Sequence, residues 1–261
     1  MKHLKIVLAA GAMSSLLSCG QAPSAPVQEV KMETPAVSKP VENITPTVDQ
    51  QRRRAASEAI CVAHNIPVYP NRNALFVAQE DSVTIRTKEE VVTRALALCF
   101  VELKSESADK TVLAAFEQQY QVMQFLTAAE KTFVLAEHPT PQDLANANWR
   151  AEGTHVMLWA LGYVDSLSFP DAVCNVTADV DLISSFTATQ FRDKAKLRSK
   201  KEILDQADLI LRYDWACTSA NLQQQGTPGN LNPEVVLERH VALNWLINYM
   251  NQAWDDVSPD T

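Results

Sequence analysis

Residues 87–101 read TKEEVVTRALALCFV and combine a helix start signal with apolar side chains at helical spacing. Thr87 and Glu90 have the spacing of a capping box, in which each side chain bonds the backbone N–H of the other residue. The apolar residues that follow recur three and four positions apart: Val91, Val92, Ala95, Leu98, Cys99 and Val101. This spacing places side chains on one face of an α-helix, so the stretch predicts a helix with a buried face.

The same start signal recurs along the chain. Capping boxes are formed by Thr47 with Gln50, Thr127 with Glu130 and Ser199 with Glu202, and a proline at the first helical position follows Thr140 and Asn232. The predicted helices begin at these sites and cover residues 48–65, 87–101, 109–125, a short segment after 127, 140–161, 199–215 and 232–251, with Gly162 as a C-terminal residue.

Outside these helices, residues 66–69 and 82–86 have a short β-like pattern and could pair as a minor hairpin. No internal repeat occurs. The sequence therefore predicts a mainly α fold, a single irregular multi-helix domain over residues 47–261. In its first helix, we expect the apolar faces formed by Ala55, Ala59 and Val62 and by Ala56, Ile60 and Ala63 to pack inward.

The N-terminus has the features of an export signal. Lys2 and Lys5 precede an apolar run that is too short to span a bilayer, and small residues then lead to Cys19. The sequence around Cys19 resembles a bacterial lipobox, which implies that residues 1–18 are removed and that Cys19 carries acyl chains. Because Gly20 and Gln21 follow and no aspartate stands there, the sorting pattern implies the outer membrane, facing the periplasm. An ordinary secretory signal and an N-terminal apolar helix are the alternatives.

Residues 19–46 form a lipidated N-terminus and a proline-rich tether. The segment carries prolines at 23, 26, 35, 40 and 46 and no aromatic residue. A chain so poor in large apolar groups cannot offset the entropy lost on ordering, so we expect it to be disordered and extended. The alternative is a proline-rich ligand for a partner domain.

Charge and composition exclude several function classes. The net charge of −8 argues against nucleic acid as a partner, because phosphate recognition needs a basic surface. The chain has 6 glycines, and none is spaced as a phosphate cradle, so no nucleotide cofactor is expected.

Cysteines and acidic residues give weak signals for crosslinks or metals. Cys61 and Cys99 lie on apolar helix faces and are interpreted as buried thiols, and Cys174 with Cys217 is the first disulfide candidate. The cysteines do not have the spacing of a zinc finger. Glu152 and His155 could form half of a di-iron site, but the chain has no second Glu-x-x-His. Asp179 and Asp181 are more typical of helix caps than of a cation site. The sequence thus predicts no metal centre and no cofactor.

Seven short motifs occur in order along the predicted domain. They are RALAL at 94–98, WRAE at 149–152, LWALG at 158–162, AKLRS at 195–199, EILD at 202–205, ERH at 238–240 and ALNWL at 242–246. Together they resemble the bacterial domain of unknown function numbered 4272 over about residues 51–250. The resemblance implies one helical domain and implies no activity, substrate or cofactor.

Polar residues gather near the tryptophans of these motifs. The candidate cluster consists of Arg150, Glu152, Arg212, Arg239 and Asn244, together with the tryptophan Trp215. One interpretation is a concave site whose arginines receive an anionic group or a peptide carboxylate. The other is a buried ion-pair network that joins the helices, since buried arginines require charge partners.

Three functions follow from these observations. The leading hypothesis is a lipid-anchored cell-envelope protein that binds a protein or peptide partner without catalysis, and that contacts the membrane through the acyl anchor at Cys19. The alternatives are a hydrolase-type enzyme that uses Glu152 with neighbouring arginines, and a purely structural envelope protein. The hydrolase requires Glu152 to lie in a solvent-open pocket.

Overall fold

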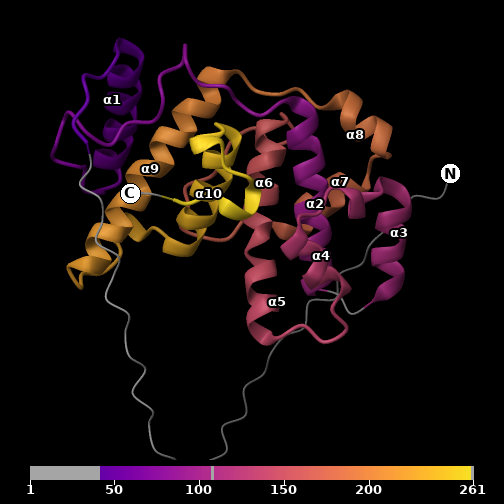
Figure 1. Cartoon of the computed structure of the whole chain (residues 1–261). Coiled ribbons are helices and arrows are strands. Elements are labelled where there is room, and N and C mark those ends of the chain that lie inside the picture. The colour runs from indigo at the N-terminus through magenta and orange to yellow at the C-terminus, as the bar shows by residue number, and fades with distance from the viewer. Residues whose placement is uncertain (1–41, 107–108, 260–261) are drawn as a thin grey trace, which may run out of the picture.

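The computed structural model describes residues 42–106 and 109–259, and in these residues the protein is helical without any β-strand (Figure 1). The prediction of a mainly α single domain is confirmed. The ten α-helices of this part are α1 (Val48–Ala63), α2 (Lys88–Glu106), α3 (Lys110–Tyr120), α4 (Ala128–Leu135), α5 (Pro141–Asn148), α6 (Arg150–Ala160), α7 (Val176–Ser184), α8 (Ala188–Lys194), α9 (Lys200–Leu222) and α10 (Pro233–Leu246). The predicted signal peptide, Cys19 and most of the tether lie outside the described residues.

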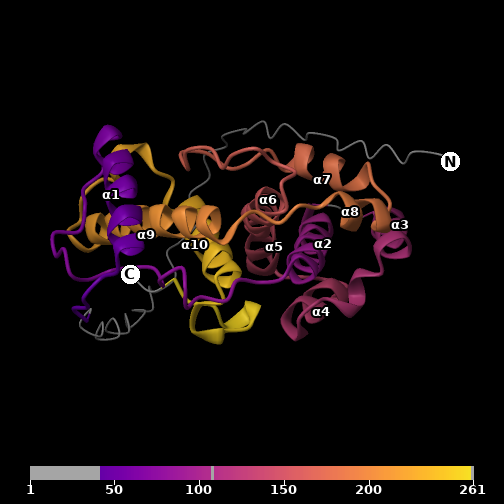
Figure 2. The ribbon, with the colours of Figure 1, turned by 90° about the horizontal axis from the view of Figure 1, so that it is seen from above.

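The helices form a row in which α1 packs on α9, α9 on α10, α10 on α6 and α6 on α2. Seen from above, α7 and α8 cover one side of this row, and α4 with the C-terminal turns covers the other (Figure 2). Most residues of α2 and α6 are buried, because the other helices and the C-terminal turns surround these two. No helix among the described residues is long and apolar enough to cross a membrane.

The predicted start signals hold in the structure. Thr47 with Gln50, Thr127 with Glu130 and Ser199 with Glu202 form capping boxes, and Asn232 accepts hydrogen bonds from the first turn of α10. Gly162 ends α6 at a φ of +75°, a left-handed conformation that glycine adopts without strain.

Several predicted boundaries are wrong. The helix expected over residues 140–161 is interrupted at Trp149, which ends α5 and begins α6. α9 continues past residue 215 to Leu222, and α10 ends at Leu246 before a short 3₁₀ turn. Both α7 and α8 are additional to the helices that the sequence predicts.

The minor hairpin does not form in the described part of the chain, because other groups use the backbone of its second segment. The Arg86 amide donates to the Leu246 carbonyl at 2.9 Å. The Arg86 guanidinium donates to the carbonyls of Trp245 (3.2 Å) and Gln252 (2.7 Å) and lies over the Trp245 ring. These bonds join residues 82–86 to the C-terminal end of α10 in place of a strand partner.

The orientation of α1 is opposite to the prediction. Its buried residues are Gln50, Arg53, Arg54, Ser57 and Cys61, and the predicted apolar faces are exposed. Arg54 donates to the backbone carbonyls of Tyr69, Asn71 and Ala74. It thereby provides hydrogen-bond donors for the irregular segment that follows α1. A loop without strand pairing needs side-chain donors for its buried carbonyls, and this requirement outweighs the apolar pattern.

Gly153 in the interior of α6 has a packing role. A Cβ atom at this position would lie 3.1 Å from Leu98 of α2 and 3.4 Å from the Trp254 ring. The glycine costs about 1 kcal/mol of helix propensity, and in exchange α6 and α2 approach closely at the centre of the domain.

Candidate binding pocket

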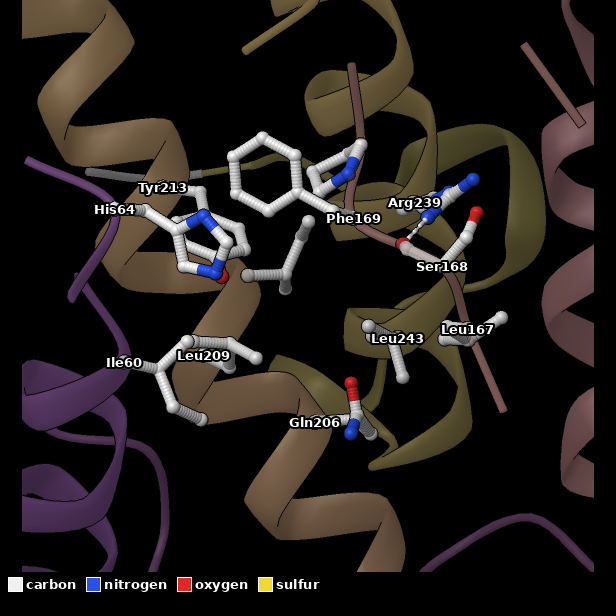
Figure 3. A pocket seen from close by; sticks show the side chains of 12 residues that line it. Ile60, His64, Leu167, Ser168, Phe169, Gln206, Leu209, Tyr213, Arg239 and Leu243 are labelled. Carbon is white, nitrogen blue, oxygen red and sulfur yellow. Dashed lines mark hydrogen bonds between the residues drawn. The ribbon is translucent and has the colours of Figure 1, made fainter. Parts of the chain in front are cut away.

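A pocket of about 190 Å³ opens between the end of α1, the loop at 167–170, α9 and α10 (Figure 3). Its apolar lining is contributed by Ile60, Leu167, Phe169, Pro170, Leu209, Ile210 and Leu243. Sites for drug-sized molecules have volumes of roughly 300–1,000 Å³. The pocket is therefore of a size to receive one side chain or a small group, and it is too small for a nucleotide cofactor.

Three rings form one wall of the pocket. His64 stacks on Phe169 with centroids 4.4 Å apart and an angle of 13°, and Phe169 meets Tyr213 edge-on at 5.8 Å. The rings come from the C-cap of α1, the 167–170 loop and α9. In Figure 3 they lie across the pocket from Leu167 and Leu243, and Gln206 points in from α9. The polar edges of His64 and Gln206 give the apolar cavity hydrogen-bonding groups.

A buried ion pair lies next to this loop. Arg239 of α10 donates through Nε to Glu152 Oε2 of α6 at 2.8 Å. Glu152 is 0% exposed and Arg239 is 2% exposed. Removing one partner of such a pair leaves an uncompensated buried charge, which is far more costly than the loss of a surface pair.

The same two side chains hold the loop that forms the pocket rim. Arg239 Nη1 donates to the Ser168 carbonyl at 2.6 Å, and the Cys174 amide donates to Glu152 Oε1 at 2.6 Å. Between these points, the Asn232 amide donates to the Pro170 carbonyl at 2.7 Å. The ion pair thus fixes both sides of the loop that carries Phe169.

A family model described as Domain of unknown function (DUF4272) matches residues 53–257. The chain belongs to this family. No curated protein and no solved structure matches the chain. The matched residues include all four elements that line the pocket and both members of the buried ion pair.

The DUF4272 domain does not bring the predicted polar cluster together at one place. Glu152 and Arg239 form the central pair, and Arg150 bonds Glu238 beside it at 3.4 Å. Arg212 instead pairs with Asp208 at 2.8 Å and donates to the Leu75 carbonyl. The network interpretation therefore describes these arginines better than a single concave site.

The two other members of the predicted cluster are also apart from the ion pair. Trp215 packs edge-on against Tyr69 at 5.3 Å, and Asn244 donates to the Ser258 carbonyl at 3.2 Å. Both residues join the helices to the irregular segments that surround them. Neither residue lines the pocket.

The geometry does not meet the condition for a hydrolase based on Glu152. The carboxylate is fully buried, both of its oxygens are engaged with Arg239 and the Cys174 amide, and Glu152 is not part of the pocket wall. A general acid or base has to reach the reacting group within hydrogen-bond distance. In this domain Glu152 is a positioning residue for the loop.

The predicted disulfide is absent, because Cys174 and Cys217 are free thiols in the structure. Cys174 lies in the loop before α7, next to Glu152, whereas Cys217 lies on α9 near Asp214 and Glu234. Cys61 and Cys99 are buried thiols, as expected. Burial raises the pKa of Cys61 to about 12.

Asp179 is not a helix cap as the sequence suggested. Asn175 caps α7 through the Ala178 amide, and Asp179 accepts a hydrogen bond at 2.8 Å from Nδ1 of His155. His155, Cys174 and Asp179 bring potential metal-ligand atoms within 4.8 Å of one another. These three residues form the group that could hold a cation in the part of the chain that is described.

Sequence reasoning did not find the pocket residues His64, Phe169, Gln206 and Tyr213. They come from three segments far apart in the chain, since Gln206 and Tyr213 are both on α9, and each has an ordinary appearance in its own segment. A weak signal was available at residues 166–170, where a phenylalanine stands before a proline in a polar loop. Such an aromatic residue needs a partner outside its own segment.

Proposed function

We propose that this protein is a lipid-anchored protein of the bacterial cell envelope that binds a peptide segment of a protein partner without catalysis. The proposal assigns binding to the pocket at Phe169 and anchoring to Cys19. The observation that supports binding most directly is the small apolar pocket, which has the dimensions of one inserted side chain. Peptide recognition commonly uses such a pocket for an anchor residue.

The exposed face of α1 supports the same proposal. Val62 is 65% exposed and Ile60 is 40% exposed, and Ile60 also lines the pocket. Ala56, Ala59 and Ala63 are exposed next to them. An apolar helix face that continues into an apolar pocket favours a partner with aliphatic or aromatic side chains, because its burial removes apolar area from water.

The anchor proposal rests on the sequence before residue 19. Several acyl chains hold a protein far better than one, since each buried methylene contributes about 0.8 kcal/mol. In this proposal the chain is attached to the outer membrane and faces the periplasm, and residues 20–46 separate the domain from the lipid surface. Mass spectrometry of the mature N-terminus tests it, because diacylglycerol on Cys19 and loss of residues 1–18 are expected. A Cys19→Ala variant that still incorporates labelled palmitate would refute it.

Peptide selection tests the binding proposal. A displayed library of random peptides is selected on the purified protein, and the enriched peptides are measured by calorimetry. We expect them to share an aliphatic or aromatic residue and to lose at least tenfold in affinity for Gln206→Trp, which fills the pocket. Gln223→Trp, at the exposed C-cap at the far end of the same helix, serves as the matched control.

Two results would contradict the proposal. One is a set of enriched peptides that bind Gln206→Trp as tightly as the wild type. The other is a selection without enrichment on the folded protein, which would favour a purely structural role in the envelope.

A further inference from the structure

A group of metal-ligating side chains lies where α6, α7 and the 163–175 loop meet, outside the pocket. The potential ligand atoms of His155, Cys174 and Asp179 all lie within 4.8 Å of one another. Around a tetrahedral Zn²⁺, ligand atoms at roughly 2.0–2.3 Å from the ion are about 3–4 Å apart. Small shifts of these side chains are therefore enough to surround an ion.

Glu102 of α2 provides a second, independent observation. It is 2% exposed, and neither of its carboxylate oxygens has a hydrogen-bond partner in the described structure. The Thr154 hydroxyl lies beside this carboxylate and donates to the Arg150 carbonyl at 3.3 Å. A buried carboxylate without a partner is rare in native proteins and calls for an ion or a water molecule.

The charges around this group point to the same place. Glu152 is neutralised by Arg239, whereas Glu102 and Asp179 form no ion pair with an arginine or lysine among the described residues. A divalent cation would offset the cost of burying these two carboxyl groups without an arginine or lysine beside them.

We propose that His155, Cys174 and Asp179 bind one Zn²⁺ ion, with Glu102 accepting a hydrogen bond from a water molecule in the fourth coordination position. The ligand set combines imidazole, thiolate and carboxylate, which suits Zn²⁺ and does not suit Mg²⁺ or Ca²⁺. On binding, the Cys174 thiol loses its proton to solvent, and the proton on His155 Nδ1 passes through solvent to Nε2, which frees Nδ1 and the Asp179 carboxylate to coordinate the ion. His155 and Cys174 are partly exposed, so an ion can reach them.

A structural hydrogen bond between His155 and Asp179 is the simpler alternative. It accounts for two of the residues at a distance of 2.8 Å. It leaves the buried carboxylate of Glu102 without a role, and it assigns the Cys174 thiol only a contact with Glu152. The two alternatives differ in whether the thiol coordinates an ion.

Titration of the metal-free full chain with Co²⁺ tests the proposal. We expect one equivalent to produce the near-ultraviolet thiolate-to-Co²⁺ charge-transfer band, and Zn²⁺ to abolish it by displacement. Cys174→Ser should lose this band, and Glu102→Gln should weaken Co²⁺ binding at least tenfold. The matched control is Cys217→Ser, which should retain the band and the wild-type affinity.

The control for folding is circular dichroism of each variant before Co²⁺ is added. If the wild type binds no Co²⁺, or if folded Cys174→Ser gives the same charge-transfer band, the site is refuted. Zinc should also raise the melting temperature of the wild type and of Cys217→Ser but not that of Cys174→Ser. An equal rise in all three would place the bound zinc elsewhere.

Discussion

Glu152 and Arg239 are joined at 2.8 Å across the contact between α6 and α10, and each also holds the backbone of the loop that forms the pocket rim. Both residues lie in the part of the chain that the family model matches, in the stretches WRAE and ERH. Their joint role is structural, and it explains why charged residues occur at such completely buried positions. The pair links the stability of the domain to the shape of the pocket.

The first prediction concerns this pair. Glu152→Gln should lower the free energy of unfolding by about 3–5 kcal/mol, because it leaves the Arg239 charge buried without an anion. Urea denaturation measures the loss. Replacing both residues by leucine should recover a large part of it, since the unpaired charge is then absent.

Glu238→Gln is the matched control for that experiment. Burial raises the pKa of Glu238, and its ion pair with Arg150 is partly exposed. Its removal should change the free energy of unfolding by at most about 1 kcal/mol. Losses of equal size in Glu152→Gln and Glu238→Gln would contradict the central role of the buried pair.

The second prediction concerns the end of α6. Gly162→Ala should destabilise the protein by about 1–2 kcal/mol, because the residue has a φ of +75° and a Cβ atom would lie 3.0 Å from the Lys196 carbonyl oxygen. Gly226→Ala is the control, since no atom lies within 4 Å of its Cβ position. Thermal unfolding of both variants measures the difference. A neutral Gly162→Ala would show that the loop adjusts.

The third prediction is a dependence of stability on acid. The pKa of Asp49 is lowered from its ordinary value of 3.8 to about 2. Burial raises this pKa, but hydrogen bonds from the Thr47 hydroxyl, the Glu80 backbone amide and the Arg53 guanidinium outweigh that effect. A lowered pKa in the folded state means that the stabilisation is complete above about pH 4 and is lost as the pH falls towards 2. Asp49→Asn should therefore be less stable than the wild type at neutral pH.

The pH profile of the difference between these two proteins is the measurement. The gap in the free energy of unfolding should close between about pH 4 and pH 2. A gap that stays constant over this range would mean that the Asp49 charge does not hold α1 to the segment around Glu80.

The fourth prediction concerns the cysteines. Without reductant, alkylation in urea followed by peptide mapping should modify Cys61, Cys99, Cys174 and Cys217, since all four are free thiols. In the native protein, Cys61 and Cys217 should react slowly, because burial raises the pKa of each to about 12. Protection of both Cys174 and Cys217 in urea, reversed by reductant, would instead demonstrate the disulfide that was the first candidate from the sequence.

The sequence by itself determined the helical class and most helix beginnings. Capping boxes such as Thr127 with Glu130 and Ser199 with Glu202 are local devices, since the groups that bond lie three residues apart in one turn. Local signals of this kind are readable without the fold. The sequence also pointed to Glu152 and Arg239 as candidate residues. It could not show that they pair with each other, because they lie on two different helices.

Only the tertiary structure decided which faces are buried and which residues meet. The apolar face of α1 is exposed because Arg54 is needed inside to bond the loop carbonyls of Tyr69, Asn71 and Ala74. The pocket combines His64, Phe169 and Tyr213 from three distant segments, and the partners of Arg212 and Arg239 are different acids. These contacts join positions that are remote in the chain, and local helical periodicity contains no information about them.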